Sequence, residues 1–330
     1  MAAAITSHRD RLERCLLSEQ LDRVPVALWR HFPVDDQDPY LLANAVSAFQ
    51  NQFDFDFIKV TPSSSYSVKD WGVTDVWRGA AEGTREYQHV IKTVEDWNKL
   101  LLLDPVKGEL GLSLETLKLL KASYGSTTPI LQTIFSPLSQ AKHLVGKANL
   151  LVHLRQYPDA LHHALQIITE TTIRYIKEVW KTGIDGIFFA VQHANPALVN
   201  KSEFLEFGKK YDLLVAQEFS NFWLNIAHIH GEPVMFDDAC DYPVQVLNWH
   251  DQSTWPSLFE GRHRSGRAVC GGIRQWETMV LGNTEDVKRE ASAAIKETDG
   301  KGFILGTGCV VPITAPFGNI MAARTIQGGV

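Results

Sequence analysis

Two histidines and one cysteine are the residues whose types and spacing most clearly suggest chemistry. His228 and His230 stand in the run Ala227-His228-Ile229-His230-Gly231. Alternate residues of a strand share a face, so both imidazoles would point the same way. Cys309 ends another candidate strand, after Gly306-Thr307-Gly308. Two imidazoles and one thiolate are the ligand set of a catalytic zinc that keeps an open fourth position.

A purely structural interpretation of these three residues stays open. A His-x-His pair is often just two hydrogen-bonded strand residues, and a lone cysteine is often a small buried apolar side chain. The metal hypothesis is favoured because the strand that ends at His230 and the strand that ends at Cys309 are expected to end at the same face of an α/β barrel. Barrels of this kind carry their active sites on that face.

A third candidate strand supplies further polar residues. Asn248 and His250 share a face of it, and Asp251 follows directly. We assign His250 and Asp251 to general acid–base catalysis, and Asn248 with its neighbour Trp249 to substrate binding. A further metal ligand, a partner that orients a ligand, and simple satisfaction of a strand end are the alternatives.

The first candidate strand ends with Trp29 and Arg30. An arginine can bind a carboxylate through two parallel hydrogen bonds, so Arg30 is assigned to both catalysis and substrate binding. Trp29 is assigned to stacking on a planar ligand. Tyr66, which begins an insertion expected to shape the mouth of the fold, is also assigned to substrate binding. Ring packing at the core or rim and a solvent-exposed loop arginine are the competing interpretations.

Eight short β-branched or aromatic runs, bounded by turn residues, predict the strands that position these side chains. Several are apolar throughout, as expected for parallel strands covered on both faces. They alternate with helical patterns, which indicates an α/β fold, a (β/α)₈ TIM barrel forming a single domain over residues 1–330. An open doubly wound sheet is the alternative. The predicted strands are Val24–Trp29, Phe55–Val60, Pro129–Ser136, Ile184–Val191, Phe222–His230, Val244–His250, Ala268–Ile273 and Gly302–Cys309.

Helical patterns are clearest where an apolar stripe follows a proline or a Ser/Thr cap. The gap between the second and third predicted strands is too long for one crossover, so it is predicted to be an insertion. The predicted helices outside the insertion are Pro158–Lys181, Ser202–Asn221 and Thr284–Glu297. The insertion combines the stretch Tyr66–Tyr87 with helices over Val94–Leu103 and Ser113–Ser123.

Composition and charge exclude several classes of protein. The 330 residues carry a formal net charge of -6, so a phosphate-neutralising surface for nucleic acid is not expected. No window approaches eighteen uncharged apolar residues, and the first residues lack the apolar stretch of a signal peptide. The four cysteines contain no Cys-x-x-Cys pair. Reduced thiols and a cytoplasmic location are therefore expected.

The chain resembles the uroporphyrinogen decarboxylase superfamily, which includes the decarboxylases and the zinc-dependent methyltransferases of corrinoid pathways. The resemblance covers nearly the whole sequence and is carried by the order and spacing of several modest motifs. These are Arg23-Val24-Pro25-Val26 with Trp29-Arg30, Phe135 to Ala141, Gly183 to Gly186, and Gly306 to Pro316.

The decarboxylase pattern is poorly met. That family shows an Arg-Gln-Ala-Gly-Arg run, and here Arg30 matches the first arginine whereas Val34 stands at the second. Pro62 stands where decarboxylases carry the aspartate that receives pyrrole N–H groups. Thr307 replaces the histidine of their Gly-His-Gly run.

The methyltransferase pattern is met more closely. That branch carries His-x-Cys on one strand and a later Cys near the end. His228 matches the first ligand and Cys309 the last, and His230 replaces the middle cysteine with another metal-capable residue. The resemblance implies zinc held by these three residues, a substrate thiol, and a methyl donor that is a corrinoid on a partner protein.

Two other functions stay open at this point. One is cofactor-free decarboxylation of uroporphyrinogen or a related acidic substrate, with Arg30 gripping a carboxylate and His228 or His230 handling protons. The other is a barrel that binds a tetrapyrrole without catalysis. The expected partners are a small-molecule thiol or tetrapyrrole and a corrinoid protein, without nucleic acid or membrane. A homodimer is one assembly that the sequence allows.

Overall fold

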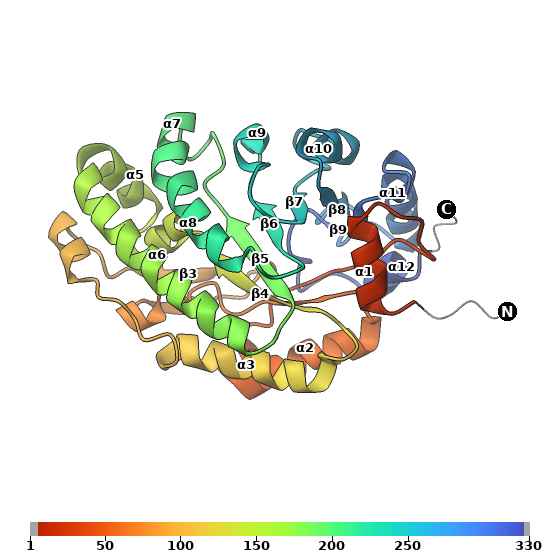
Figure 1. Cartoon of the computed structure of the whole chain (residues 1–330), viewed down its shortest axis with the longest axis horizontal. Helices are drawn as coiled ribbons and strands as arrows, with labels where there is room; N and C mark the ends of the chain where they lie inside the picture. The colour runs from red at the N-terminus through yellow and green to blue at the C-terminus, as the bar shows by residue number, and fades with distance from the viewer. Residues whose placement is uncertain (1–5, 327–330) are drawn as a thin grey trace.

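Seven parallel strands form one curled sheet, in the order β1-β4-β5-β6-β7-β8-β9. A computed structural model describes residues 6–326, and Figure 1 shows the helices arranged around these strands. The α/β class and the parallel sheet are confirmed, and each of the seven strands falls within a predicted range. Their bounds are β1 (Ile58–Val60), β4 (Ile130–Phe135), β5 (Gly186–Val191), β6 (Ile226–Ile229), β7 (Val246–Trp249), β8 (Ala268–Ile273) and β9 (Phe303–Thr307).

The first predicted strand, Val24–Trp29, is not a regular strand. It makes one isolated parallel bridge to β9, between Val26 and Leu305. Two features of the chain explain the difference. Pro25 has no N–H to donate, and the N–H of Val26 donates to the carboxylate of Asp56 at 2.7 Å instead of to a neighbouring carbonyl. The N–H of Asp56 in turn donates to the carbonyl of Val26 at 2.9 Å, so the segment lies between β9 and the chain that leads into β1.

The helices follow the strands, as the sequence indicates. The predicted helices Pro158–Lys181 and Thr284–Glu297 are found with the same bounds, whereas Ser202–Asn221 is interrupted by a π-helical turn, η4 (Phe204–Lys209). The α-helices are α1 (His8–Leu16), α2 (Pro39–Phe53), α3 (Gly108–Tyr124), α4 (Pro137–Val145), α5 (Lys147–Gln156), α6 (Pro158–Lys181), α7 (Lys201–Glu203), α8 (Lys210–Phe219), α9 (Phe236–Ala239), α10 (Leu258–Ser265), α11 (Thr284–Glu297) and α12 (Phe317–Arg324).

The segment between β1 and β4 carries its own small antiparallel hairpin, β2 (Thr74–Trp77) with β3 (Arg85–Gln88). Within this segment, the 3₁₀ helix η2 (Lys69–Trp71) precedes the hairpin and η3 (Val94–Lys99) follows it. A further 3₁₀ helix, η1 (Asp35–Gln37), lies before β1. The α-helix predicted over Val94–Leu103 is therefore a shorter 3₁₀ helix. The helix predicted over Ser113–Ser123 begins earlier, as α3.

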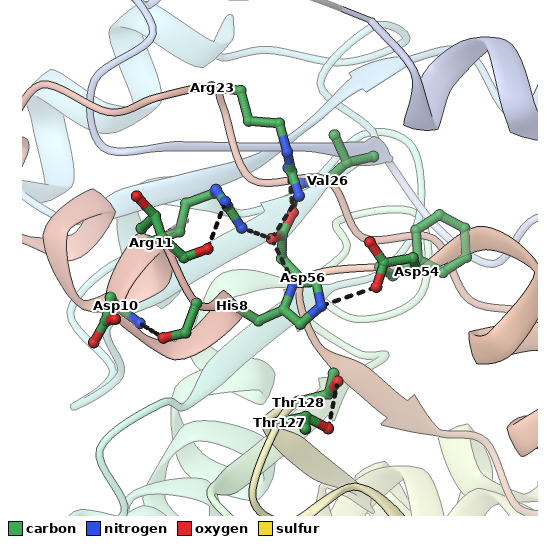
Figure 2. Close-up of polar contacts among 12 residues, drawn as sticks. His8, Asp10, Arg11, Arg23, Val26, Asp54, Asp56, Thr127 and Thr128 are labelled. Atoms are coloured by element: carbon green, nitrogen blue, oxygen red, sulfur yellow. Dashed lines mark hydrogen bonds and ion pairs between the residues drawn. The ribbon is translucent and has the colours of Figure 1, made fainter. Parts of the chain in front are cut away.

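A buried carboxylate joins the N-terminal helix to the start of the sheet. The side chain of Asp56 is 0% exposed and accepts hydrogen bonds from Arg11 at 2.7 Å, Arg23 at 2.6 Å and His8 at 3.0 Å, besides the N–H of Val26 (Figure 2). Burial by itself raises the pKa of Asp56. The hydrogen bonds and ion pairs from His8 and Arg23 outweigh it and hold that pKa well below its ordinary range. The carboxylate is therefore ionised and fully paired.

Two predictions from composition can be compared with the described residues. No helix among them is both long and apolar enough to cross a bilayer. All four cysteines are free, as expected for reduced thiols.

A second buried carboxyl group predicts a pH-dependent stability. Asp212 on α8 accepts a hydrogen bond from the hydroxyl of Tyr242 at 2.6 Å, and burial raises its pKa to about 7. The unfolded chain has a pKa near 3.9 at this residue, so the folded state holds the proton more tightly. The stability that Asp212 contributes is therefore complete below about pH 4 and lost as the pH rises to about 7.

Asp212→Asn keeps the acceptor for Tyr242 and removes the ionisation. The variant should match the wild type near pH 4 and exceed its free energy of unfolding by up to about 4 kcal/mol at pH 8. Urea denaturation at four pH values measures this difference. An offset that stays the same at every pH would contradict the prediction.

Candidate functional site

Four metal-capable side chains meet at the carboxyl end of the sheet. His228 lies in β6 and His230 just beyond it, His250 follows β7, and Cys309 follows β9. One donor atom from each lies within 4.8 Å of the others. The Sγ atom of Cys309 is 3.6 Å from Nε2 of His228 and 3.7 Å from Nδ1 of His230, and these two nitrogens are 3.3 Å apart. The structure thus brings the predicted triad together and adds His250.

A glycine allows Cys309 to come this close. A Cβ atom on Gly308 would lie 2.7 Å from Cα of His250 and 2.8 Å from the carbonyl oxygen of Trp249. Any side chain at residue 308 would therefore push the end of β9 away from the end of β7. The missing side chain lets the two strand ends lie in contact, and Cys309 follows directly.

Asn248 fixes the tautomer of His228. Its amide nitrogen donates to the carbonyl oxygens of Cys270 at 2.9 Å and Thr307 at 3.1 Å. Its amide oxygen therefore faces Nδ1 of His228, at 2.6 Å, and must accept the proton from that nitrogen. The Nε2 lone pair of His228 is left free toward His230 and Cys309. A partner of this kind is typical behind metal-binding histidines.

Burial shifts the pKa values of the three histidines in the direction that metal binding requires. It lowers the pKa of His228 well below its ordinary value and that of His230 to about 4, and it lowers the pKa of His250 as well. The imidazoles are therefore neutral, with lone pairs available. Burial also raises the pKa of the Cys309 thiol to about 12. Only a cation at this point would make the thiolate the favoured form.

The donor set fits zinc. Three neutral imidazoles and one thiolate are borderline-soft nitrogen and sulfur ligands, which zinc binds in tetrahedral geometry. One ring nitrogen of His250 is free to bind a metal. Its Nδ1 lies 3.3 Å from a carboxylate oxygen of Glu232, whereas its buried Nε2 has no hydrogen-bond partner among the described residues.

The cluster opens into a cavity of about 410 Å³. Trp29, predicted to bind substrate, lines this cavity together with Lys59 and Phe188. The ammonium group of Lys59 lies 4.7 Å from the centre of the Phe188 ring, and burial lowers the pKa of this lysine to about 7. A cavity of this size suits a small molecule that reaches His228, His230 and Cys309.

Asp251 lines a second cavity, of about 280 Å³, together with His250. Its carboxyl group accepts the N–H of Gly272 at 3.1 Å, and burial raises its pKa to about 7. Glu82, from the loop between β2 and β3, lines both cavities. Both residues of the predicted acid–base pair, His250 and Asp251, therefore line the second cavity, and neither lines the main one.

Four further side chains that the sequence assigned to the site do not line the main cavity. Arg30 packs over Phe32, with its guanidinium 5.1 Å from the ring centre. Tyr66 is buried and donates to the carbonyl of Thr133. Trp249 follows Asn248 in β7, so its side chain lies on the opposite face of the strand. Its indole N–H donates to the carbonyl of Pro256. Asn248 itself is fully buried, and its side-chain amide makes its hydrogen bonds to His228, Cys270 and Thr307.

Sequence reasoning missed the basic side chains of the main cavity. Lys59, Lys142, Lys147 and His193 all line it. Lys59 carried a usable signal, since a lysine inside an otherwise apolar strand must be paired or face a cavity. Lys142 and Lys147 carried none, because lysine is ordinary on a helix surface.

Comparison with known proteins gives one family. The family model described as uroporphyrinogen decarboxylase (URO-D) matches residues 7–326. The chain is 24% identical to the methylcobamide:CoM methyltransferase MtbA of Methanosarcina acetivorans, over 94% of this chain and 95% of that protein. It is 26% identical to the methylcobamide:CoM methyltransferase MtaA of Methanosarcina barkeri, over 63% of this chain and 60% of that protein.

Solved structures agree on the fold. A methyltransferase from Methanosarcina mazei aligns with a TM-score of 0.84 at 22% identity, over 97% of this chain and 98% of that one. A B12-independent methionine synthase from Shewanella sp. W3-18-1 aligns with a TM-score of 0.55 at 14% identity, over 93% of this chain and 94% of that one. At these identities the likeness concerns the fold alone.

Proposed function

Because the chain belongs to the uroporphyrinogen decarboxylase family, we propose that it is a methyltransferase that moves a methyl group between a corrinoid and a thiol at a zinc site. The observation that carries the proposal is the convergence of His228, His230, His250 and Cys309 at the strand ends. The relatives are methylcobamide:CoM methyltransferases, so in those proteins methylcobamide is the methyl donor and CoM the acceptor.

We assign His228, His230 and Cys309 to the zinc, and His250 to a fourth position that the substrate thiol takes over when it binds. When bound, zinc supplies the Lewis acidity that lowers the pKa of a thiol. The protein groups do the positioning: Asn248 orients His228, and Glu232 orients His250. The thiolate sulfur then attacks the methyl carbon of a corrinoid held by a partner protein. A carbon–sulfur bond forms while the carbon–cobalt bond breaks, and its electron pair stays on cobalt.

The proposal includes the architecture around the site. We take residues 1–330 as one TIM-barrel domain, in which the segment 24–29 stands in the place of the eighth strand between β9 and β1. In such a barrel the carboxyl ends of the strands carry the active site, which is where the four donors meet.

The decarboxylase alternative depended on Arg30 gripping a substrate carboxylate. That guanidinium packs on Phe32 and does not line the main cavity, so no specific observation favours the alternative.

Metal analysis of protein purified without added zinc, followed by methyl transfer from methylcobalamin to small thiols, tests the proposal. We expect about one zinc per chain and thiol-dependent loss of the methyl group from the corrinoid. Protein that cannot be loaded with zinc, or loaded protein that never demethylates the corrinoid with any thiol, would reject it. Turnover of uroporphyrinogen without metal would favour the decarboxylase, and tetrapyrrole binding without either reaction would favour a binding protein.

Substitution of Asn248 tests the link between the sheet and the metal. Asn248→Leu removes the acceptor for Nδ1 of His228, so we expect zinc affinity to fall about 10- to 100-fold. Asn225 is a matched control, because it too is fully buried and donates to two backbone carbonyls, but at the amino end of β6. Asn225→Leu should lower the melting temperature similarly and leave zinc affinity unchanged. Equal zinc affinities of the two variants would contradict the assignment. Competition with a chromophoric chelator measures both.

A further inference from the structure

The four metal-capable side chains border two cavities. His228, His230 and Cys309 line the main cavity, whereas His250 lines the second cavity, of about 280 Å³. Glu82 lines both cavities and so marks where they adjoin. A metal ion can therefore approach the four donors from either cavity, and the charges that line each cavity decide which approach is favoured.

The main cavity repels a cation. Lys59, Lys142 and Lys147 line it, and among residues 6–326 no carboxylate lies within 4.0 Å of any of their ammonium groups. Lys142 donates to the amide oxygen of Gln192 at 2.6 Å, which is a neutral contact. Burial lowers the pKa of Lys142 only to about 8, so this amine is mostly protonated at pH 7. A divalent cation on this side meets positive charge that no anion offsets.

The second cavity attracts a cation. Its lining holds four carboxylates and one guanidinium group, namely Glu82, Glu232, Asp251 and Glu277 with Arg274. The guanidinium of Arg274 pairs with Glu290 at 2.7 Å. Among the described residues, no lysine or arginine nitrogen lies within 4.0 Å of the carboxylates of Glu82, Glu232 or Glu277. A cleft lined by charge of one sign concentrates the field and raises the local concentration of the opposite ion.

His250 connects this negative charge to the other donors. Its side chain is 14% exposed, and its Nδ1 lies 3.3 Å from a carboxylate oxygen of Glu232, which is 50% exposed. Its Nε2 is buried and has no hydrogen-bond partner in the described part of the chain. Gly308, the residue before Cys309, lines the same cavity. The lining of the second cavity thus leads from exposed carboxylates to a buried imidazole and to the backbone beside the thiol.

The order of these groups suits the inward passage of a divalent cation. Carboxylate oxygens are harder ligands than imidazole nitrogens and thiolate sulfur, which zinc prefers. The glutamates can therefore attract zinc without retaining it. A water molecule takes up about 30 Å³ in the liquid, so a cavity of about 280 Å³ has room for a cation with several of its waters.

We propose that the second cavity is the entrance through which a divalent metal ion reaches the four donors, drawn in by Glu82, Glu232 and Glu277 and met first by His250. The inference rests on the metal site of the function proposed above and adds how that site is filled. A separate entrance leaves the main cavity to the substrate, so a small molecule in the main cavity does not block the path of the ion.

Uptake of Co²⁺ by metal-free protein tests the proposal by stopped-flow absorbance at pH 7. Co²⁺ takes the place of zinc because zinc has a filled d shell and no visible absorption. The charge-transfer band between the Cys309 thiolate and cobalt reports arrival at the donors and not capture by the glutamates. The second-order rate constant is measured at about 0.01 M and about 1 M salt, where the Debye length is about 30 Å and about 3 Å.

Glu277 is the carboxylate to change, because its side chain is exposed and it is not one of the four donors. At low salt, Glu277→Gln should lower the rate constant about threefold and Glu277→Lys about tenfold, since each change weakens the attraction for a divalent cation. The differences should nearly vanish at high salt. The cobalt bound per chain at saturation should equal that of the wild type. If Glu277→Lys fails to fold, Glu277→Gln carries the test.

Two further variants separate the entrance from effects of charge elsewhere. Glu115→Lys is the matched control, because Glu115 lies on α3, lines neither cavity and has a side chain that is 39% exposed. It should keep the wild-type rate constant within about twofold. Lys147→Met removes a positive charge from the main cavity and should also leave the rate constant within about twofold, because the ion does not pass there.

The outcomes separate this inference from the proposed function. A rate constant that Glu277→Lys leaves unchanged, or that Glu115→Lys lowers as much, overturns the entrance and leaves the metal site intact. A severalfold faster uptake by Lys147→Met overturns it too, because the ion then enters through the main cavity. Wild-type protein that never develops the charge-transfer band removes the metal site of the proposed function, and the entrance with it.

Discussion

Cys309→Ser is expected to reduce bound zinc to less than about a tenth of an equivalent and methyl transfer by at least about a thousandfold. This effect is larger than the 10- to 100-fold typical of residues that only orient a ligand. Cys309 is the one thiolate among the four donors, and a serine hydroxyl in the same place is a far poorer zinc ligand. Zinc content by mass spectrometry and demethylation of methylcobalamin by absorbance measure the two quantities.

Cys240→Ser is the control for loss of a thiol elsewhere. Cys240 follows α9 and contacts the carbonyl of Asp237, away from the metal cluster. It should keep both zinc and activity. A Cys309→Ser protein that retains a full equivalent of zinc at wild-type affinity would show that Cys309 is not a ligand, whatever happens to its activity.

Asp56→Asn is expected to lower the free energy of unfolding by about 3–5 kcal/mol at pH 7. The change removes the charge that pairs with Arg11 and Arg23 and leaves two guanidinium groups without their buried partner. It also weakens the connection between α1, the segment 24–29 and β1, which all meet at this carboxylate (Figure 2). Urea denaturation followed by circular dichroism measures the loss.

The same substitution has a defined pH dependence. Because the folded protein holds the pKa of Asp56 below its unfolded value, the stability it contributes is present above about pH 4 and is lost as the pH falls below that. The gap between wild type and Asp56→Asn should therefore shrink in acid. Asp22→Asn is the matched control, since Asp22 pairs with the same Arg11 but its side chain is 42% exposed. It should cost less than about 1 kcal/mol. A comparable loss from both substitutions would contradict the role given to burial.

The sheet could be predicted from the sequence because its strands are apolar on both faces. Runs such as Gly186–Val191 have few alternatives to a buried parallel strand, and the start of α6 is marked by a proline. The start of α11 was predicted from a Thr cap at Thr284, whereas the structure has Asn283 as the cap. The segment Val24–Trp29 looked the same. It failed to become a regular strand because a side chain 30 residues away, Asp56, takes the hydrogen bond that a carbonyl would have accepted.

The cluster of metal-capable side chains, His228, His230, His250 and Cys309, could be predicted only in part. The two-residue period of a strand placed His228 and His230 on one face, and the barrel rule placed Cys309 at the same end. The rule says nothing about side chains just past a strand end, where the direction depends on the loop. A further metal ligand therefore stayed one alternative among others for Asn248, His250 and Asp251, and the structure brings His250 to the other three donors.

The assigned side chains that lie outside the main cavity share a physical cause. Arg30 and Trp249 are long side chains near strand ends, and each contacts an aromatic ring or a backbone carbonyl instead of the cavity. Residue type alone does not say which side a long side chain takes. Lys59, Lys142 and Lys147 were missed for the converse reason, since they come from three elements that meet only in the folded chain.

The hydrogen bonds of Asn248 make the strand ends around His228 hard to change by substitution, whereas the helices that line the main cavity are free of that constraint. That amide ties His228 on β6 to backbone carbonyls of β8 and β9, so another choice of metal would need matching shifts in three strands at once. Lys142 and Lys147 belong to helices outside the sheet and can be exchanged one at a time. Changing the small molecule that fits the main cavity should therefore need few substitutions, whereas changing the geometry of the donor side chains should need many.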